Sequence, residues 1–439
     1  MDDNNLRTGR QQLISVIGCF SALCILGCLT AAIFGGAFFK PHSRLQLAAA
    51  FLLTALAAAL MGFDRRGVFS LIDGLARPGL RRPRTALLGL MLISTVVALA
   101  TAGWVLDRFA NSADEYAYVL QAKTYASGRL WVEAPPLPEA FQMYRFLAKD
   151  GLWLSQYPPG WAAGLAIFEV LGVPLVVVDP LLAAATVFAF FSLAKMELSP
   201  RAAWLASLTL VCGAFFVLTY ASYLSHGVAA LAGLASIAFA THYLKSGKAI
   251  AALLAGVCLG YLGFTRPFNA VIFAVPIAVA LLLTPGRRVG HLLVAAGGLP
   301  FLLALLAYNQ AITGNPLVMR ATWLQPGGEP LGAPSAAYIV ENIKRAGLLH
   351  LWSSPLLPLG WVAAFFLLAK RRRLGLADWI APATFIAFIF YGGDSGNHYG
   401  PRYYFEAWPF MLFTLFKAFD LVFFQEARKS SRVGPERLC

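Results

Sequence analysis

Long apolar segments alternate along this chain with short polar or basic links. A helix of about 20 apolar residues spans the hydrocarbon core of a bilayer. The segments are rich in Ala, Leu and Gly, which suits closely packed membrane helices, and none alternates residue by residue as a barrel strand does. The pattern predicts an all-α polytopic integral membrane protein with about 11 to 13 transmembrane helices. The candidate spans are 14–39, 45–63, 85–106, 160–178, 181–194, 202–220, 227–243, 250–264, 268–284, 291–311, 351–369, 380–391 and 403–424.

Composition supports this class. The chain is 59% hydrophobic and 13% charged, whereas about a quarter of the residues in a soluble domain are charged. Five of the six cysteines lie within candidate spans and the sixth is the last residue, so neither a disulfide framework nor a metal-binding Cys spacing is present.

The placement of charge predicts the topology. The net charge is +14, and segment 64–84 holds six Arg against two Asp. Because basic links face the cytoplasm, this segment and the links 287–288 and 370–373 are expected inside. The loop 107–159 holds five basic and six acidic residues, and the loop 313–350 holds three and two. These two mixed loops are expected to face outward, and nucleic acid is not an expected partner.

Three parts of the chain follow from this topology. Residues 1–84 form two N-terminal spans and a basic cytoplasmic loop, residues 85–424 form the main membrane domain, and residues 425–439 form a basic cytoplasmic tail. All the basic links can face the cytoplasm only if residues 160–194 cross the membrane once or three times. Two apolar segments stand there, however. Asp179-Pro180 is interpreted as the mark of a re-entrant or interfacial helix.

The first outer loop carries the clearest local pattern. Ser112 followed by Glu115 is a capping box, so a helix is expected to begin there and to stop at Gly128. Tyr118 and Tyr125 share one face of this helix, which suits a position along the membrane interface. The cap uses Glu115 and does not need Asp114, so Asp114 is the carboxylate available for chemistry. The alternative is that Asp114 only complements the helix dipole.

Several segments together resemble a known family. They are Asp114-Glu115, the aromatic helix 116–128, Tyr157-Pro158-Pro159 before a span, Tyr308-Asn309 with 313–317, and Tyr399-Gly400-Pro401-Arg402-Tyr403. The chain resembles the GT-C superfamily of membrane glycosyltransferases, in particular the protein O-mannosyltransferase and lipid A aminoarabinose transferase group (glycosyltransferase family 39-like). The first 84 residues have no counterpart in this resemblance. Near 223–226 many relatives carry an outward acid, which this chain lacks.

The resemblance implies a function. The expected reaction transfers a sugar from a polyprenyl-phosphate donor to an envelope lipid, glycan or protein, with inversion, at the outer face of a bacterial inner membrane. Such a displacement needs a base, for which Asp114 is the candidate beside Glu115. It also needs fixed cations at the leaving phosphate. The candidate substrate-binding residues are Arg402, Tyr403, His398, Arg266, Arg320, Tyr157 and Tyr118.

Other interpretations remain open at this stage. Arg402 could anchor a helix at the interface, and Arg266 could be an ordinary snorkelling side chain. A polytopic transporter or flippase of lipid-linked sugars would instead place ionisable residues along a path near the bilayer midplane. A scaffold without chemistry is the third hypothesis. The loop carboxylates could hold Mg²⁺ weakly, but the sequence favours transfer without a metal or other cofactor, and membrane lipids are the expected surroundings.

Overall fold

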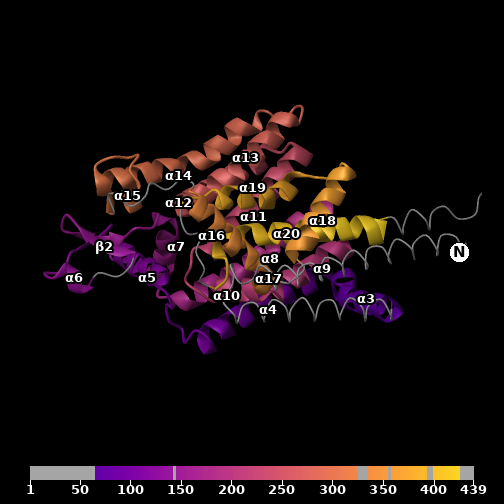
Figure 1. Cartoon of the computed structure of the whole chain (residues 1–439), viewed down its shortest axis with the longest axis horizontal. Helices are drawn as coiled ribbons and strands as arrows, with labels where there is room; N and C mark the ends of the chain where they lie inside the picture. Colours follow the sequence, from indigo (N-terminus) through magenta and orange to yellow (C-terminus); the bar gives the residue numbers. More distant parts are fainter. Residues whose placement is uncertain (1–64, 142–144, 325–334, 354–356, 393–398, 426–439) are drawn as a thin grey trace, which may run out of the picture.

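The computed structural model describes residues 65–141, 145–324, 335–353, 357–392 and 399–425. This part of the chain is mostly helical, and its long helices run along the longest axis of the molecule (Figure 1). The expected helical membrane fold is confirmed. The expected spans 14–39 and 45–63, His398 and nearly all of the tail 425–439 lie outside the described residues.

The helices, with 3-10 segments and one π segment labelled η, follow in chain order as α3 (Arg65–Arg81), α4 (Pro83–Trp104), α5 (Ala113–Ala126), α6 (Pro138–Phe141), α7 (Pro159–Val170), η1 (Leu175–Val177), α8 (Val178–Glu197), α9 (Pro200–Val211), α10 (Ala214–Tyr220), α11 (His226–Ser246), α12 (Ala249–Thr265), α13 (Pro267–Leu283), α14 (Gly290–Thr313), α15 (Arg320–Leu324), α16 (Ala336–Gly347), α17 (Leu349–Trp352), α18 (Leu357–Lys370), η2 (Leu376–Trp379), α19 (Ile380–Ile389), η3 (Arg402–Ala407), α20 (Trp408–Phe419) and η4 (Asp420–Gln425). The strands are β1 (Val132–Glu133), β2 (Phe146–Lys149) and β3 (Leu152–Ser155).

Four described helices are long and apolar enough to cross a membrane, namely α4, η1 with α8, α11 and α14. The pair α9 and α10, which bends by 60°, makes a fifth candidate. Shorter apolar helices of 10–17 residues accompany them: α12, α13, α18 and η2 with α19. The chain is therefore a multi-pass membrane protein. The total of about 11 to 13 spans includes segments beyond the described residues and stays a prediction.

The segment 160–194 contains one helix of spanning length. Helix α7 has 12 residues and is therefore about 18 Å long, too short for a hydrocarbon core of about 30 Å. The next helix starts with η1 and continues through Asp179-Pro180 to Glu197 as one span of 23 residues. These lengths favour a single crossing, the first of the two alternatives that the charge pattern left open.

The loop 107–159 contains a small sheet that the sequence did not predict. Strand β3 lies between β1 and β2, and both pairings are antiparallel. The sheet and α5 lie at one end of the long axis, and α3 lies toward the other (Figure 1). Helix α3 itself was expected to be a basic loop. It is amphipathic and packs on α9, where Trp204 Nε1 donates to Leu75 O at 2.8 Å.

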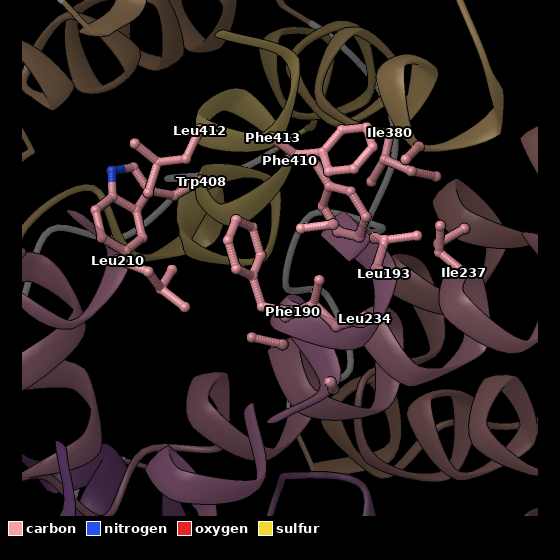
Figure 2. Packing of buried hydrophobic residues seen from close by; sticks show 14 of the residues in the cluster. Phe190, Leu193, Leu210, Leu234, Ile237, Ile380, Trp408, Phe410, Leu412 and Phe413 are labelled. Atoms are coloured by element: carbon pink, nitrogen blue, oxygen red, sulfur yellow. The ribbon is translucent and has the colours of Figure 1, made fainter. Parts of the chain in front are cut away.

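Buried apolar residues from α8, α9, α11 and α20 form the main core. Phe190 and Leu193 of α8 meet Phe410 and Phe413 of α20 in this cluster (Figure 2). At the end of α20 away from η3, Lys417 Nζ lies 2.7 Å from both Glu197 and Asp378. These contacts fix α20, and so fix η3, which precedes it.

Helices α12 and α14 approach so closely that only glycine fits at parts of their contact. A Cβ on Gly297 would lie 2.2 Å from the backbone oxygen of Leu253, whereas a Cβ on Gly298 would lie 3.4 Å from its nearest neighbour, Gly256 O. Small residues that let backbones approach are a common way to pack membrane helices. The pair α12 and α14 carries Arg266 and Tyr308 at its C-terminal ends, so this contact also positions the site.

Gly297→Ala should therefore destabilise the protein, because the added methyl group meets backbone that cannot rotate away. Overpacking typically costs about 1–3 kcal/mol, so the midpoint of thermal unfolding in detergent should fall by several degrees. Gly298→Ala is the matched control and should unfold close to wild type. Equal midpoints for the two variants would contradict the packing described here.

Candidate active site

The N-terminus of α5 is capped as the sequence predicted. Ser112 Oγ accepts a hydrogen bond from the Glu115 backbone N–H at 3.3 Å. The Glu115 carboxylate accepts from the backbone N–H of Asn111 and from Ser112 Oγ, and its other oxygen accepts from the N–H of Tyr223, each within 3.1 Å. Glu115 thus joins α5 to the turn between α10 and α11. Its catalytic role stays a prediction, while its contacts are those of a cap.

The next carboxylate, Asp114, meets the start of the last long helix. Arg402 Nη2 of η3 lies 2.5 Å from Asp114 Oδ2. Tyr157 Oη donates a short hydrogen bond to Asp114 Oδ1, and Arg145 Nε lies 3.8 Å from the same oxygen. Asp114 is only 8% exposed. Three of the predicted residues, far apart in sequence, are therefore brought together.

The charges around Asp114 decide its ionisation. Burial alone would raise its pKa, but the Arg402 charge, the hydrogen bonds from Tyr157 and Arg402, and the Arg145 charge together lower the pKa of Asp114 below its usual value. Burial and the neighbouring Asp114 charge raise the pKa of Tyr157 well above its usual value, so Tyr157 stays a donor. Asp114 is therefore an ionised carboxylate at neutral pH.

A second pair of charges lies beside the first. Arg266, between α12 and α13, places Nε 3.3 Å from Glu406 Oε1 of η3. His226 Nδ1 lies 3.1 Å from the same oxygen, and Arg266 Nη1 donates to Ser225 Oγ at 3.1 Å. An acid was expected near 223–226 from the resemblance and is missing there. In the structure an acid from the far end of the chain, Glu406, contacts this segment.

Aromatic rings connect the two pairs. The Tyr403 ring has the guanidinium carbon of Arg266 at 5.2 Å and that of Arg402 at 5.8 Å from its centroid. Tyr118 stacks on Tyr157 with 4.6 Å between ring centroids, and Tyr118 Oη lies 2.9 Å from Ser225 Oγ. Tyr118 is buried against α7, so this face of α5 packs on protein instead of lying along the membrane interface.

The close approach of α7 to α12 sets the position of Tyr157. A Cβ on Gly160 would lie 2.5 Å from Thr265 Oγ1 and 2.7 Å from the backbone of Phe264. Pro158 caps α7 and Pro159 begins it, as the sequence predicted. Tyr157 is thereby held beside Asp114, next to the helix end that carries Arg266.

The two guanidinium groups keep hydrogen-bond capacity. Within the described chain, the buried Nε atoms of Arg402 and Arg266 have no hydrogen-bond partner. The two side chains are 14% and 16% exposed. Unsatisfied donors on buried cations suit an anion with several acceptor oxygens, such as a phosphate.

Arg320 belongs to a different cluster. Its Nη1 donates to Ser155 O at 2.8 Å and to Tyr308 Oη at 2.6 Å, and Tyr125 Oη donates to Tyr308 Oη at 2.9 Å. Tyr125 is eleven residues after Asp114 on α5, which corresponds to about 16 Å along the helix. The structure does not bring Arg320 to Asp114. Arg320 instead links α14 and α15 to strand β3.

Sequence reasoning missed Arg145, Ser225, His226 and Glu406 as neighbours of the site. Glu406 could have been found, because an acid inside an apolar span is costly and usually has a specific partner. Arg145 has φ of +82°, a conformation that non-glycine residues rarely adopt. Within the described residues no cluster of three or more His, Cys, Asp or Glu side chains is arranged to hold a metal ion.

Comparison with known proteins finds similar folds among solved structures but no match by sequence. No protein-family model and no curated protein matches the sequence. The chain is similar to the structure of ArnT from Cupriavidus metallidurans bound to undecaprenyl phosphate, with a TM-score of 0.52 and 14% identity over 76% of this chain and 59% of that chain. The apo state of that protein gives a TM-score of 0.51, with 14% identity over 79% and 60% of the two chains.

A weaker likeness is to the oligosaccharyltransferase AglB from Archaeoglobus fulgidus in complex with an inhibitory peptide and a dolichol-phosphate. Its TM-score is 0.45, with 12% identity over 80% of this chain and 52% of that chain, and no argument rests on it. ArnT is a GT-C membrane glycosyltransferase, and the present chain has this fold. The resemblance inferred from the sequence is thus confirmed for the fold. The chain spans about 59% of the length of the ArnT chain.

The ionisation of Asp114 can be tested directly. In Arg402→Gln the strongest interaction that lowers the pKa of Asp114 is lost, and burial, which raises that pKa, should dominate. A hydrophobic carbodiimide modifies protonated carboxyls, and mass spectrometry measures its attachment at Asp114. The labelling midpoint should move to higher pH in the variant. Arg345→Gln, which breaks the partly exposed pair with Glu341 on α16, should leave the labelling midpoint of Asp114 unchanged. An unchanged midpoint in Arg402→Gln would refute the assignment.

Proposed function

We propose that this protein transfers a sugar from a polyprenyl-phosphate donor to an acceptor hydroxyl at the periplasmic face of a bacterial inner membrane. The observation that carries the proposal is the Asp114–Arg402 pair beside Arg266, in which both guanidinium groups keep unsatisfied donors. ArnT, which has this fold, is described with undecaprenyl phosphate bound. The acceptor is an envelope lipid, glycan or protein, and the surrounding membrane lipids receive the donor's hydrocarbon chain.

The cations suit the leaving group. Arg145, Arg266 and Arg402 carry three positive charges, and the Asp114 carboxylate carries a negative one. A phosphate that enters beside Tyr403 would meet planar guanidinium forks, which match its oxygens. These fixed charges stabilise the charge that develops on the phosphate as the bond to the sugar breaks. We propose that they do so without a metal or other cofactor.

Asp114 is the proposed general base. The acceptor oxygen attacks the anomeric carbon, the bond from that carbon to the phosphate oxygen breaks, and the acceptor proton passes to Asp114. The products are the glycosylated acceptor and the polyprenyl phosphate, and the attack from the opposite side inverts the configuration at the anomeric carbon. In the structure Arg402 holds Asp114. A phosphate that shares Arg402 would weaken that hold and make Asp114 more basic when the donor is bound.

The remaining predicted residues have supporting parts in this proposal. Tyr157 orients the Asp114 carboxylate through its hydrogen bond, and Tyr118 supports Tyr157 by stacking. Tyr403 offers a ring face beside both cations, on which a sugar or phosphate can lie. Glu115 holds the helix end that carries Asp114. The charges gather at helix ends, an arrangement that favours a surface reaction over the transporter or flippase alternative, which needs a path near the midplane.

Asp114→Asn should abolish turnover while the protein still folds. The amide keeps the shape and one acceptor oxygen, which can still accept from Tyr157, but it is not a base. Removing a general base typically costs about 10²–10⁴ in rate, so product should fall by about 100-fold or more. A panel of polyprenyl-phosphate sugars and an envelope extract supply the substrates. Asp107→Asn, on the exposed loop seven residues earlier, is the control and should stay active.

Arg402→Gln should weaken binding of the lipid phosphate. A hydrogen bond to a charged group contributes about 1.5–3 kcal/mol, so the Kd for undecaprenyl phosphate should rise by about tenfold or more. Microscale thermophoresis in detergent can measure it, with Arg345→Gln as the control. Wild-type affinity in a folded Arg402→Gln variant would count against a phosphate at this position.

A further inference from the structure

The short helix η3 carries two oppositely charged residues, and each is paired across to another element. Arg402 pairs with Asp114 of α5, and Glu406, four residues later, pairs with Arg266 between α12 and α13. The proposed function uses Arg402, Arg266 and Asp114 directly. It assigns no task to Glu406.

The burial of Glu406 at this position costs free energy. It is 0% exposed, its Oε1 is shared by Arg266 and His226, and its Oε2 has no hydrogen-bond partner in the described part of the chain. Burying a carboxylate is costly even when a cation is near, and an apolar side chain of similar size is often as stable or more stable. Stability of the fold is therefore a weak reason for an acid here.

The contacts show what Glu406 does to its partner. Arg266 is held at Nε by Glu406 and at Nη1 by Ser225, and its guanidinium carbon lies 5.2 Å from the Tyr403 ring centroid. Nη2 takes part in neither of these contacts, and Nε, which lies 3.3 Å from Glu406, makes an ion pair there without a hydrogen bond. A long Arg side chain loses rotamer entropy when it is held in one position. Fixing it in advance removes that cost from ligand binding.

We propose that Glu406 is a positioning residue that holds Arg266 so that its Nη2 and the unsatisfied donors of Arg402 face one and the same phosphate. This inference rests on the proposed function and adds a residue to it. Both guanidinium carbons lie within 5.8 Å of the Tyr403 ring centroid, which places the phosphate of the lipid donor next to that ring. Glu406 acts through Arg266 and does not touch the donor.

The test measures the Kd for undecaprenyl phosphate in detergent-purified, full-length Glu406→Gln. The amide has the same shape but cannot hold Arg266 by charge, so the Kd should rise by about tenfold, with a smaller rise in Glu406→Asp, which keeps the charge on a shorter stem. Glu341→Gln removes an acid that is 41% exposed and pairs with Arg345 on α16. This control should bind like wild type.

A double variant separates positioning from a general effect on the fold. If Glu406 acts through Arg266, then Glu406→Gln should add almost nothing to the Kd once Arg266 is already Gln. A purely structural Glu406 would lower the unfolding midpoint and add its own effect on the Kd in both backgrounds, and that result would overturn the inference. If Glu406→Gln does not fold, Glu406→Asp with and without Arg266→Gln gives the same comparison.

The outcomes also separate this inference from the proposed function. Should wild type fail to bind undecaprenyl phosphate, or should Arg402→Gln bind it unchanged, the proposed function fails and the inference fails with it. Should Arg402→Gln weaken binding while folded Glu406→Gln keeps wild-type affinity, the inference alone is overturned. The expected result is that Arg402→Gln and Glu406→Gln each weaken binding, and that Glu406→Gln causes no further weakening when Arg266 is already Gln.

Discussion

The ion pair between Asp114 and Arg402 is the contact on which the site depends, because it joins α5 in the loop 107–159 to η3, which leads into α20. The side chains of Asp114 and Arg402 are only 11% and 14% exposed, so the hydration that these two charges lose must be replaced by contacts within the protein. Tyr157 and Arg145 supply part of that compensation. Every element that fixes these groups, from the cap of α5 to the Lys417 contacts behind η3, therefore serves the same geometry.

Local sequence rules predicted the elements that local physics decides. The cap at Ser112, the end of α5 before Gly128 and the start of α7 at Pro159 follow from nearby residues alone. The apolar spans follow from length and hydropathy, and most appear as helices within a few residues of the expected bounds. Rules of this kind depend on neighbours in sequence, so they need no knowledge of the fold.

What sequence reasoning missed depends on contacts between distant segments. The strands of the outer loop have two to four residues and exist only through pairing with one another. Arg320 was expected near the phosphate, but the position of α15 directs it to Tyr308 and Ser155. Glu406 contacts His226 in the segment 223–226, where this chain lacks the acid noted for many relatives, and no pattern within either segment reveals that they meet.

The fold by itself does not establish chemistry, since one fold can carry many functions. The function proposed here rests on whether a lipid phosphate enters between Arg402 and Arg266 beside Tyr403. A cryo-electron microscopy structure with undecaprenyl phosphate tests that most directly. The account predicts phosphate density in contact with both guanidinium groups and a longer Asp114–Arg402 distance than 2.5 Å. Density at another position, such as the Arg320 cluster, with the Asp114–Arg402 pair unchanged, would contradict it.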